Sequence, residues 1–160
     1  MRIRRATRID TRPMADLLNE IIAAGGTTAI TDLVSGKMLW DWIETGAERA
    51  AWHVADDAGD IIGFQWIGPQ DYLPDEACDI ATFVRIGQTG LGTGSKLFEA
   101  TRAAAEALGY VWINANIRAD NDSGLTYHQS RGFRDYDRWH DYRLNNGQKV
   151  DKVLKRFDLD

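Results

Sequence analysis

The stretch GQTGLGTGSKLFEATRAAAEALGY, residues 87–110, places four glycines in eight residues directly ahead of a run with a helical pattern. That run is rich in Ala, Leu, Lys and Glu, and Gly109 after it is typical of a helix C-terminus. A glycine-rich turn leaves backbone N–H groups unpaired at the start of a helix, where they and the helix dipole bind phosphate oxygens. The stretch therefore predicts a phosphate-binding turn; a glycine-rich turn without a ligand is the alternative.

Strand-like and helix-like segments alternate along the rest of the chain, without repeats or low-complexity linkers. The Asp- and Gly-containing turn DDAGD favours a hairpin between two of the strands. The pattern predicts an α/β (α+β) fold in a single domain, residues 1–160. Strands are expected over 3–7, 50–55, 61–67, 78–85, 110–117, 133–144 and 149–159, and helices over 10–24, 35–44, 94–108 and 122–131.

Composition narrows the class of protein. The chain has 160 residues, 44% of them hydrophobic, and no apolar run approaching 18 residues, so we expect a soluble, cytoplasmic protein without a membrane span. A formal net charge of −5 opposes binding to the phosphate backbone of nucleic acid. The single cysteine, Cys78, excludes an internal disulfide and is expected to be a strand residue rather than a nucleophile. The three histidines share no metal-ligand spacing, so no metal site is expected.

Two familiar phosphate-binding motifs do not fit the glycine-rich turn. A P-loop needs GxxxxGK[ST], whereas Ser95 and Lys96 stand in the reverse order. A dinucleotide-binding fingerprint needs GxGxxG in the first βαβ unit, whereas Gly90, Gly92 and Gly94 are spaced GxGxG in mid-chain. A third motif does fit.

The turn resembles the pyrophosphate-binding signature [Q/R]xxGxG[A/G] of the GNAT acyl-CoA N-acyltransferases. Gly90 and Gly92 occupy the GxG positions, while Gly87 stands where the family usually has Gln or Arg. A second segment, NDSGLTYHQSRGF at residues 121–133, is similar to the family pattern Nxx[A/S]xxLYxxxGF. His128 takes the place of the family tyrosine, as it can in the phosphinothricin-type branch of small-molecule acetyltransferases, which implies a bacterial protein.

This resemblance implies the fold and the cosubstrate. The sheet would be mixed but mostly antiparallel and flanked by helices, and its fourth and fifth strands would splay apart to bind acetyl-CoA. For Asn121, a role as a helix cap alone is the alternative to cofactor binding. The expected acetyl-CoA-binding residues are Phe83, Val84, Arg85, Gln88, Thr89, Gly90, Leu91, Gly92, Thr93, Gly94, Ser95, Asn116 and Asn121.

The resemblance also implies direct transfer of an acetyl group to an amine, without an acyl-enzyme. His128 is the first choice for the acid that protonates the leaving thiolate, because an imidazole can donate a proton near neutrality. Tyr127 is the second choice. Asp79 and Glu76 are candidates for the base that takes the amine proton, with water or the substrate itself as alternatives.

Aromatic residues in the variable segments suggest walls for the acceptor. Trp40, Trp42 and Trp139 are the candidate substrate-binding residues, and they favour the primary amine of a small molecule. A noncatalytic acyl-CoA sensor and a protein N-acetyltransferase are the alternatives. Family members often pair through terminal strands, so the resemblance also allows a homodimer.

Overall fold

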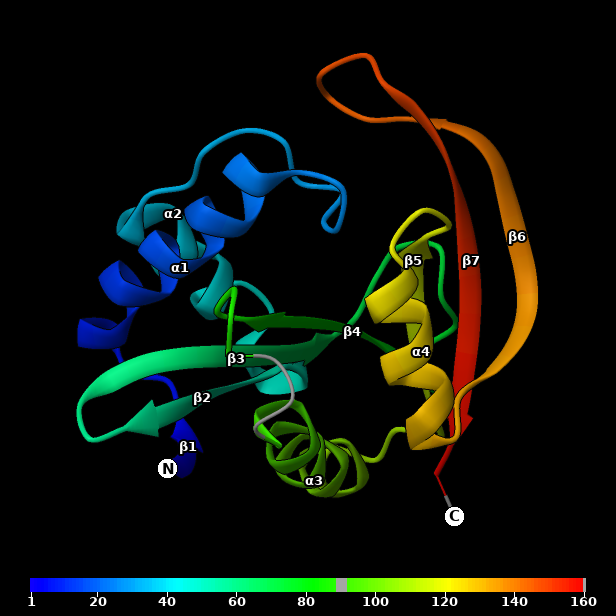
Figure 1. Cartoon of the computed structure of the whole chain (residues 1–160). Helices are drawn as coiled ribbons and strands as arrows, with labels where there is room; N and C mark the ends of the chain where they lie inside the picture. The colour runs from blue at the N-terminus through cyan, green and yellow to red at the C-terminus, as the bar shows by residue number, and fades with distance from the viewer. Residues whose placement is uncertain (89–91, 160) are drawn as a thin grey trace.

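The computed structural model describes residues 1–88 and 92–159, and its strands form one sheet in the order β1-β2-β3-β4-β5-β7-β6 (Figure 1). The expected elements all occur, in the expected order, with ends that differ from the predictions by at most two residues. Neighbouring strands are antiparallel except β4 and β5, which are parallel, so the prediction of a mixed, mostly antiparallel sheet is confirmed. The strands are β1 (Arg2–Arg5), β2 (Ala51–Asp57), β3 (Asp60–Gly68), β4 (Ala77–Val84), β5 (Trp112–Arg118), β6 (Arg134–Arg143) and β7 (Lys149–Asp158).

Helices cover both faces of the sheet. On one face, α1 (Thr11–Ala24) and α2 (Gly36–Glu44) bury a core around Leu18, Leu39 and Phe64. On the other, α3 (Thr93–Ala107) packs mainly on β2 and β3, and α4 (Asp122–Arg131) packs on β5. Two short 3₁₀ helices, η1 (Arg8–Asp10) and η2 (Ala47–Arg49), complete the structure, and no helix of the described residues is long and apolar enough to cross a membrane.

The two parallel strands pair along only a fraction of their length. Residues 77–80 of β4 face residues 112–115 of β5, and the pairing ends there. Beyond that point the rest of β4 is bonded to β3 alone, and the rest of β5 is bonded to β7. The strands therefore diverge after Ile80 and Ala115, which confirms the predicted splay and opens a gap in the middle of the sheet (Figure 1).

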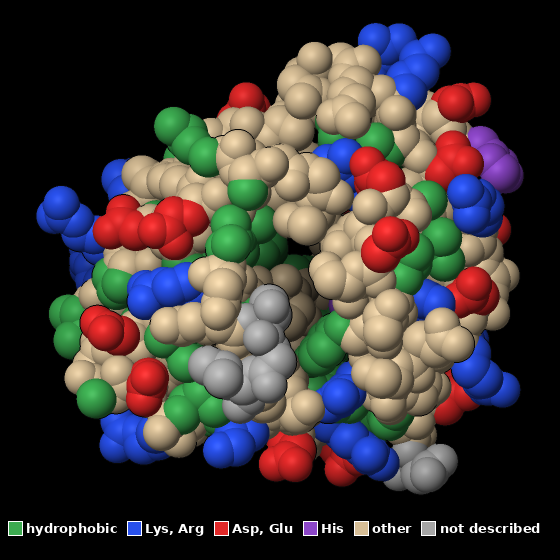
Figure 2. All heavy atoms as spheres, viewed as in Figure 1, with side chains coloured by type: hydrophobic (Ala, Val, Ile, Leu, Met, Phe, Trp, Pro, Cys, Tyr) green, Lys and Arg blue, Asp and Glu red, His purple; other side chains and the backbone are tan. Residues whose placement is uncertain are grey.

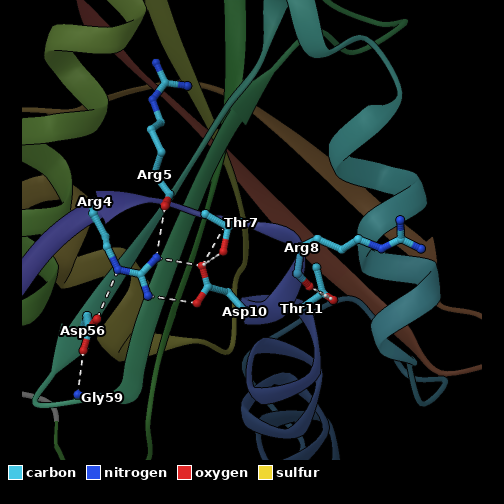
Figure 3. A network of polar contacts seen from close by, with 8 residues as sticks. All are labelled: Arg4, Arg5, Thr7, Arg8, Asp10, Thr11, Asp56 and Gly59. Atoms are coloured by element: carbon cyan, nitrogen blue, oxygen red, sulfur yellow. Dashed lines mark hydrogen bonds and ion pairs between the residues drawn. The ribbon is translucent and has the colours of Figure 1, made fainter.

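A partly buried ion pair joins the segment before α1 to the sheet (Figure 3). The guanidinium of Arg4 donates to both carboxylate oxygens of Asp10, at 2.7 and 2.9 Å, and to Asp56 at 3.1 Å. Asp10 also accepts the backbone N–H of Thr7 at 2.7 Å. These hydrogen bonds, that to Arg4 above all, hold the pKa of Asp10 below its usual value. The network ties Asp10, the residue before α1, to β1 and β2.

Candidate active site

A cleft of about 2190 Å³ lies at the splay of β4 and β5. It is bordered by both strands, by α4, by the loop between α1 and α2, and by the loop between β3 and β4. Figure 2 shows the surface hollowed near its middle, where these elements meet. The expected site residues that line the cleft are Trp42, Asp79, Phe83, Val84, Thr93, Gly94, Asn116, Asn121, Tyr127, His128 and Trp139.

Of the other expected residues that the structure describes, Gln88 lies in the turn after β4, and Gly92 and Ser95 lie at the start of α3; none of them lines the cleft. The remaining three, Trp40, Glu76 and Arg85, lie away from it, contrary to the sequence-based expectation. Trp40 packs under the guanidinium of Arg8, 5.7 Å from the ring centroid, because it faces η1 rather than the sheet gap. Glu76 is exposed at the opposite end of β4 from the splay. Arg85 turns its guanidinium back to donate to the carbonyl of Ile61 at 3.0 Å. Thr89, Gly90 and Leu91 lie outside the described residues.

The N-terminus of α3 has the features expected of a phosphate-binding turn. Gly92 precedes the helix with a φ of +79°, in the left-handed region that favours glycine. Lys96 donates the first intrahelical bond, to the carbonyl of Gly92, so the preceding N–H groups have no partner within the helix. An added Cβ at Gly92 would meet no atom of the described residues within 4 Å, which leaves room for a ligand beside this backbone.

The open edge of β4 offers a second set of backbone groups. Arg85 donates its N–H to the carbonyl of Ile62 on β3, and backbone bonds alternate between the two edges of a strand. The backbone groups of Thr82 and Val84 therefore face the gap. Together with the start of α3 they could hold the pantetheine and pyrophosphate of acetyl-CoA, so the described residues fit this cosubstrate.

Arg131, which sequence reasoning missed, adds a cation to the same region. Its guanidinium donates to the hydroxyl of Ser95, in the first turn of α3, and lies 5.4 Å from the ring centroid of Tyr127. A cation beside unpaired N–H groups favours a phosphate. The helical spacing of α4 could have indicated it, because Arg131 lies one turn after Tyr127 on the face toward α3.

Two side chains fasten the α1–α2 loop to the end of β5. Asn121 caps α4 by accepting the N–H of Gly124 at 3.0 Å, and its amide also donates to the carbonyl of Thr27 at 3.1 Å. Arg118 is only 5% exposed; it donates to the carbonyl of Thr28 at 3.1 Å and pairs with the carboxylate of Asp120. The α1–α2 loop, which borders the cleft, is thus held through the backbone carbonyls of Thr27 and Thr28.

His128 is buried on α4 in a single tautomer. Its Nδ1 lies 2.7 Å from the carbonyl of Gly124, which can only accept, so Nδ1 carries the proton. Its Nε2 is buried and has no hydrogen-bond partner among the described residues. Burial lowers the pKa of His128 to about 4. The ring is therefore neutral near pH 7 and presents a lone pair, not a second N–H.

Tyr127, the next residue along, keeps a phenol proton. Its hydroxyl donates to the carbonyl of Gly94 at 2.7 Å and accepts from the amide of Gln65 at 3.2 Å. Gln65 is fully buried and also donates to Thr82 at 2.8 Å. Burial raises the pKa of Tyr127. A Cβ added to Gly94 would lie 2.7 Å from the Tyr127 ring, so only glycine fits beside it.

Asp79 lies at the apex of the splay, with one oxygen hydrogen-bonded to the neighbouring strand. The side-chain amide of Asn114 donates to its Oδ1 at 3.0 Å, and that of Gln70 approaches its Oδ2 at 3.5 Å. The carboxyl is 8% exposed, and burial raises its pKa to about 7 despite these bonds and the charge of Lys152. Asp79 can therefore exchange a proton near neutrality.

An aromatic wall stands opposite Asp79. Tyr72, from the β3–β4 loop, meets Trp139 edge to face at a centroid distance of 4.9 Å, and Trp139 stacks on Tyr142 at 6.0 Å. The Nζ of Lys152 lies 3.9 Å from the Tyr142 ring centroid. Sequence reasoning singled out Trp139 but missed the other three, because β6, β7 and a loop bring them together only in the fold.

Cys78 supplies no nucleophile. It is fully buried in β4, and burial raises the pKa of its thiol to about 12. Within residues 1–88 and 92–159, no three His, Cys, Asp or Glu side chains gather in a way that could hold a metal ion.

The fold is that of the GNAT acetyltransferases. The structure of ribosomal-protein-alanine N-acetyltransferase from Brucella melitensis superposes with a TM-score of 0.91, covering 99% of this chain and 100% of that one at 20% identity. A GNAT superfamily phosphinothricin acetyltransferase from Sinorhizobium meliloti in complex with AcCoA has a TM-score of 0.85, covering 99% and 88% at 19% identity.

The sequence is similar to phosphinothricin N-acetyltransferase of Streptomyces viridochromogenes, with 26% identity over 133 residues, 82% of this chain and 73% of that protein. No family model matches the sequence. The chain thus has the fold of the GNAT acetyltransferases, and its sequence is similar to a phosphinothricin N-acetyltransferase. This agrees with the resemblance drawn from the two sequence motifs.

Proposed function

We propose that this protein transfers the acetyl group of acetyl-CoA directly to the primary amine of a small molecule. The observation that carries the proposal is the cleft at the splay of β4 and β5. Asp79, whose pKa is about 7, lines it together with the aromatic side chains of Tyr72 and Trp139. The open edge of β4 and the N-terminus of α3 border the same cleft. Acetyl-CoA would supply an activated acyl group with a thiol leaving group. The neighbouring structure in complex with AcCoA supports this cosubstrate.

Asp79 is the proposed general base. An amine reaches the site mostly as an ammonium ion and must lose a proton before its lone pair can attack. A carboxyl whose pKa lies near 7 exists partly as carboxylate at neutral pH and still binds the proton that it receives. Asn114 holds its Oδ1, which leaves Oδ2 as the oxygen for the proton. Glu76 lies away from the cleft and is not included in the proposal.

Tyr127 is the proposed acid for the leaving thiolate. Tyr127 keeps its proton at neutral pH; the proton is donated to the carbonyl of Gly94, but rotation about the C–O bond can turn it to the leaving thiolate. His128 is neutral, and its one N–H, donated to the carbonyl of Gly124, is fixed in the ring plane. This reverses the order of preference reached from sequence. His128 could instead accept a hydrogen bond at Nε2, and the amide N–H groups of pantetheine are donors of the right kind.

Lys152 suggests that the acceptor carries an anionic group beside its amine. The Lys152 side chain is 7% exposed, and no carboxylate of the described residues pairs with it, yet its residue lines the cleft near Asp79. A buried cation that contacts the rings of Trp139 and Tyr142 but has no described carboxylate at ion-pair distance favours an anionic ligand. An amino acid or a similar zwitterion would satisfy both charges.

The discriminating experiment combines calorimetry with an amine screen. Titration with acetyl-CoA and with free CoA measures cosubstrate binding, and thiol release against a panel of amino acids, amino alcohols and simple amines measures transfer. Binding with amine-dependent thiol release supports the proposal. Binding without release from any amine favours a sensor, release only with peptides favours a protein N-acetyltransferase, and absence of binding refutes all three.

A further inference from the structure

Two tryptophans of neighbouring strands lie side by side on the face of the sheet that α1 and α2 cover. Trp52 of β2 and Trp66 of β3 are directly opposite in the antiparallel register, and their ring centroids are 6.0 Å apart. A Cβ added at Gly63 of β3 would meet Thr93 of α3 at 3.2 Å, and side chains alternate along a strand, so Trp66 faces away from α3. The mechanism above uses neither ring.

The Trp66 ring lies beside the proposed base. A Cβ added at Gly68 would lie 2.5 Å from Cζ2 of Trp66, so the indole leans along β3 over Gly68. Gly68 is directly opposite Asp79 in the pairing of β3 with β4. Paired residues present their side chains on the same face, so the indole is the apolar neighbour of the Asp79 carboxyl.

Both indole rings border the cleft. Trp52 and Trp66 are half-buried and line it, together with Trp42 of α2, which is 38% exposed. Figure 2 shows hydrophobic side chains beside the hollow in the middle of this surface. The residue opposite Trp66 on β4 is Ala81, whose small side chain also lines the cleft and takes up little of the space beside the rings. Such apolar surface is stabilised when an apolar group covers it.

The groups that fit acetyl-CoA lie elsewhere in the cleft. The start of α3 is on the opposite face of the sheet, and the backbone groups of Thr82 and Val84 face the gap between β4 and β5. The acceptor is therefore the ligand that reaches the tryptophans.

We propose that the acceptor carries a bulky apolar group, of the size of an aromatic ring, which packs on Trp66 and Trp52 while its amine lies at Asp79. Residues two apart on a strand are about 7 Å apart, and the Trp66 ring leans toward Asp79, so a link of about two carbons joins the amine to the apolar group. The inference rests on the proposed acetyl transfer and adds the class of acceptor: hydrophobic amines and amino acids, rather than small polar ones.

Two matched pairs of acceptors test this class. The compounds 2-phenylethylamine and ethylamine differ by one phenyl group, as do L-phenylalanine and L-alanine. The wild-type protein is expected to have a kcat/KM at least about 30-fold higher for the phenyl-bearing member of each pair that it acetylates, the order of effect of burying a ring-sized side chain. Trp66→Ala is expected to reduce this ratio to about threefold or less, through the KM of the phenyl-bearing acceptor, with the KM for acetyl-CoA within about twofold of wild type.

A second variant, Ala81→Leu, removes no ring. Its larger side chain would occupy the space opposite Trp66, so it should also lower the ratio, and it decides the question if Trp66→Ala is unstable. The control is Trp40→Ala, which also loses an indole, but one that lies outside the cleft, 5.7 Å from the guanidinium of Arg8. It should keep the wild-type ratio.

A wild-type ratio close to one would overturn the inference, as would a ratio that neither Trp66→Ala nor Ala81→Leu changes. Acetylation of small polar amines, but of neither phenyl-bearing acceptor, would also overturn it and would leave the proposed acetyl transfer standing. If acetyl-CoA does not bind, or no amine releases thiol, the proposed function fails and this inference fails with it.

Discussion

The side-chain amide of Asn114 donates a 3.0 Å hydrogen bond to Asp79 at the last residues over which β4 and β5 pair. Asp79 is opposite Asn114 in this parallel register, and the strands diverge just beyond the next residue pair. The carboxyl is therefore buried by the sheet on one side and open to the cleft on the other. That position explains why its pKa rises to about 7 and why the raised value matters for proton transfer.

Replacing Asp79 by asparagine should lower kcat by about 10² to 10⁴ while acetyl-CoA affinity stays within twofold, because the base is lost but the cosubstrate contacts remain. In the wild-type protein, kcat/KM should rise with pH through about 7, as the Asp79 carboxyl ionises in the presence of Lys152, Tyr72 and Tyr136. This rising limb of the pH profile should vanish in the Asp79→Asn variant. Steady-state rates from pH 5.5 to 9 check this. Glu76→Gln is the matched control and should keep the limb; its loss in that variant instead would assign the base to Glu76.

The two candidate acids can be separated by substitution. Tyr127→Phe should reduce kcat by about 10- to 100-fold, since the phenol proton is lost. His128→Phe should leave the pH dependence near neutrality unchanged, because the imidazole with a pKa of about 4 does not titrate there. Single-turnover rates with saturating acetyl-CoA measure both. Loss of a pH limb in His128→Phe, with Tyr127→Phe close to wild type, would restore the order expected from sequence.

Gly92→Asp should abolish acetyl-CoA binding while the fold survives. The new carboxylate would stand at the N-terminus of α3, where we place the pyrophosphate, and its repulsion adds to the loss of backbone access. Gly147→Asp is the control: Gly147 also has a positive φ, +87°, with no atom of the described residues within 4 Å of an added Cβ, but it lies in the turn between β6 and β7 and not at the start of a helix. It carries the same backbone strain and charge. Calorimetry should find no acetyl-CoA binding for the first variant and wild-type affinity for the second; unchanged affinity in Gly92→Asp would remove the phosphate-binding assignment.

The features that could be predicted from the sequence are those carried by segments close together in the chain, and the features that could not are made by segments far apart. The splay followed from two motifs that lie on consecutive elements, and Asp79 followed from its place on β4. Tyr72 and Lys152 could not be found in this way, since their roles depend on a loop and on β7 meeting across the sheet. The tautomer and neutrality of His128 also depend on packing, because burial, invisible in a single sequence, sets its pKa. Trp40 shows the converse: it faces η1, whereas Trp42, two residues further on, lines the cleft, because helix positions two apart lie on different sides.

Lys152→Met should weaken the binding of acceptors that carry a carboxylate much more than the binding of the corresponding amino alcohols. If the ammonium binds an anion on the acceptor, the KM for L-phenylalanine should rise by about 10-fold or more, whereas that for L-phenylalaninol should change little. Removing this cation should also raise the pKa of Asp79, because its charge favours the carboxylate, so the pH limb should move to higher pH. Initial rates at several pH values give both results. An equal change in KM for the two acceptors would show that Lys152 does not recognise the carboxylate.

Acid stability should depend on His53 and His128 together with Asp79. Burial lowers the pKa of both imidazoles from 6.5 to about 4, so the unfolded chain binds protons that the folded one refuses, and stability is lost as pH falls from 6.5 toward 4. Between pH 7 and pH 5 each histidine costs about 2 kcal/mol by linkage. Asp79 acts in the opposite sense: its pKa is raised to about 7, so the folded protein takes up a proton over this interval and gains a similar amount. The wild-type protein should therefore lose a net amount of about 2 kcal/mol, measured as the free energy of unfolding in urea. His53→Leu should be almost insensitive to pH over the same interval, because one histidine then offsets Asp79, whereas Asp79→Asn should lose about twice as much as the wild type. A His53→Leu variant that loses as much as the wild type would show that this imidazole is protonated in the folded protein.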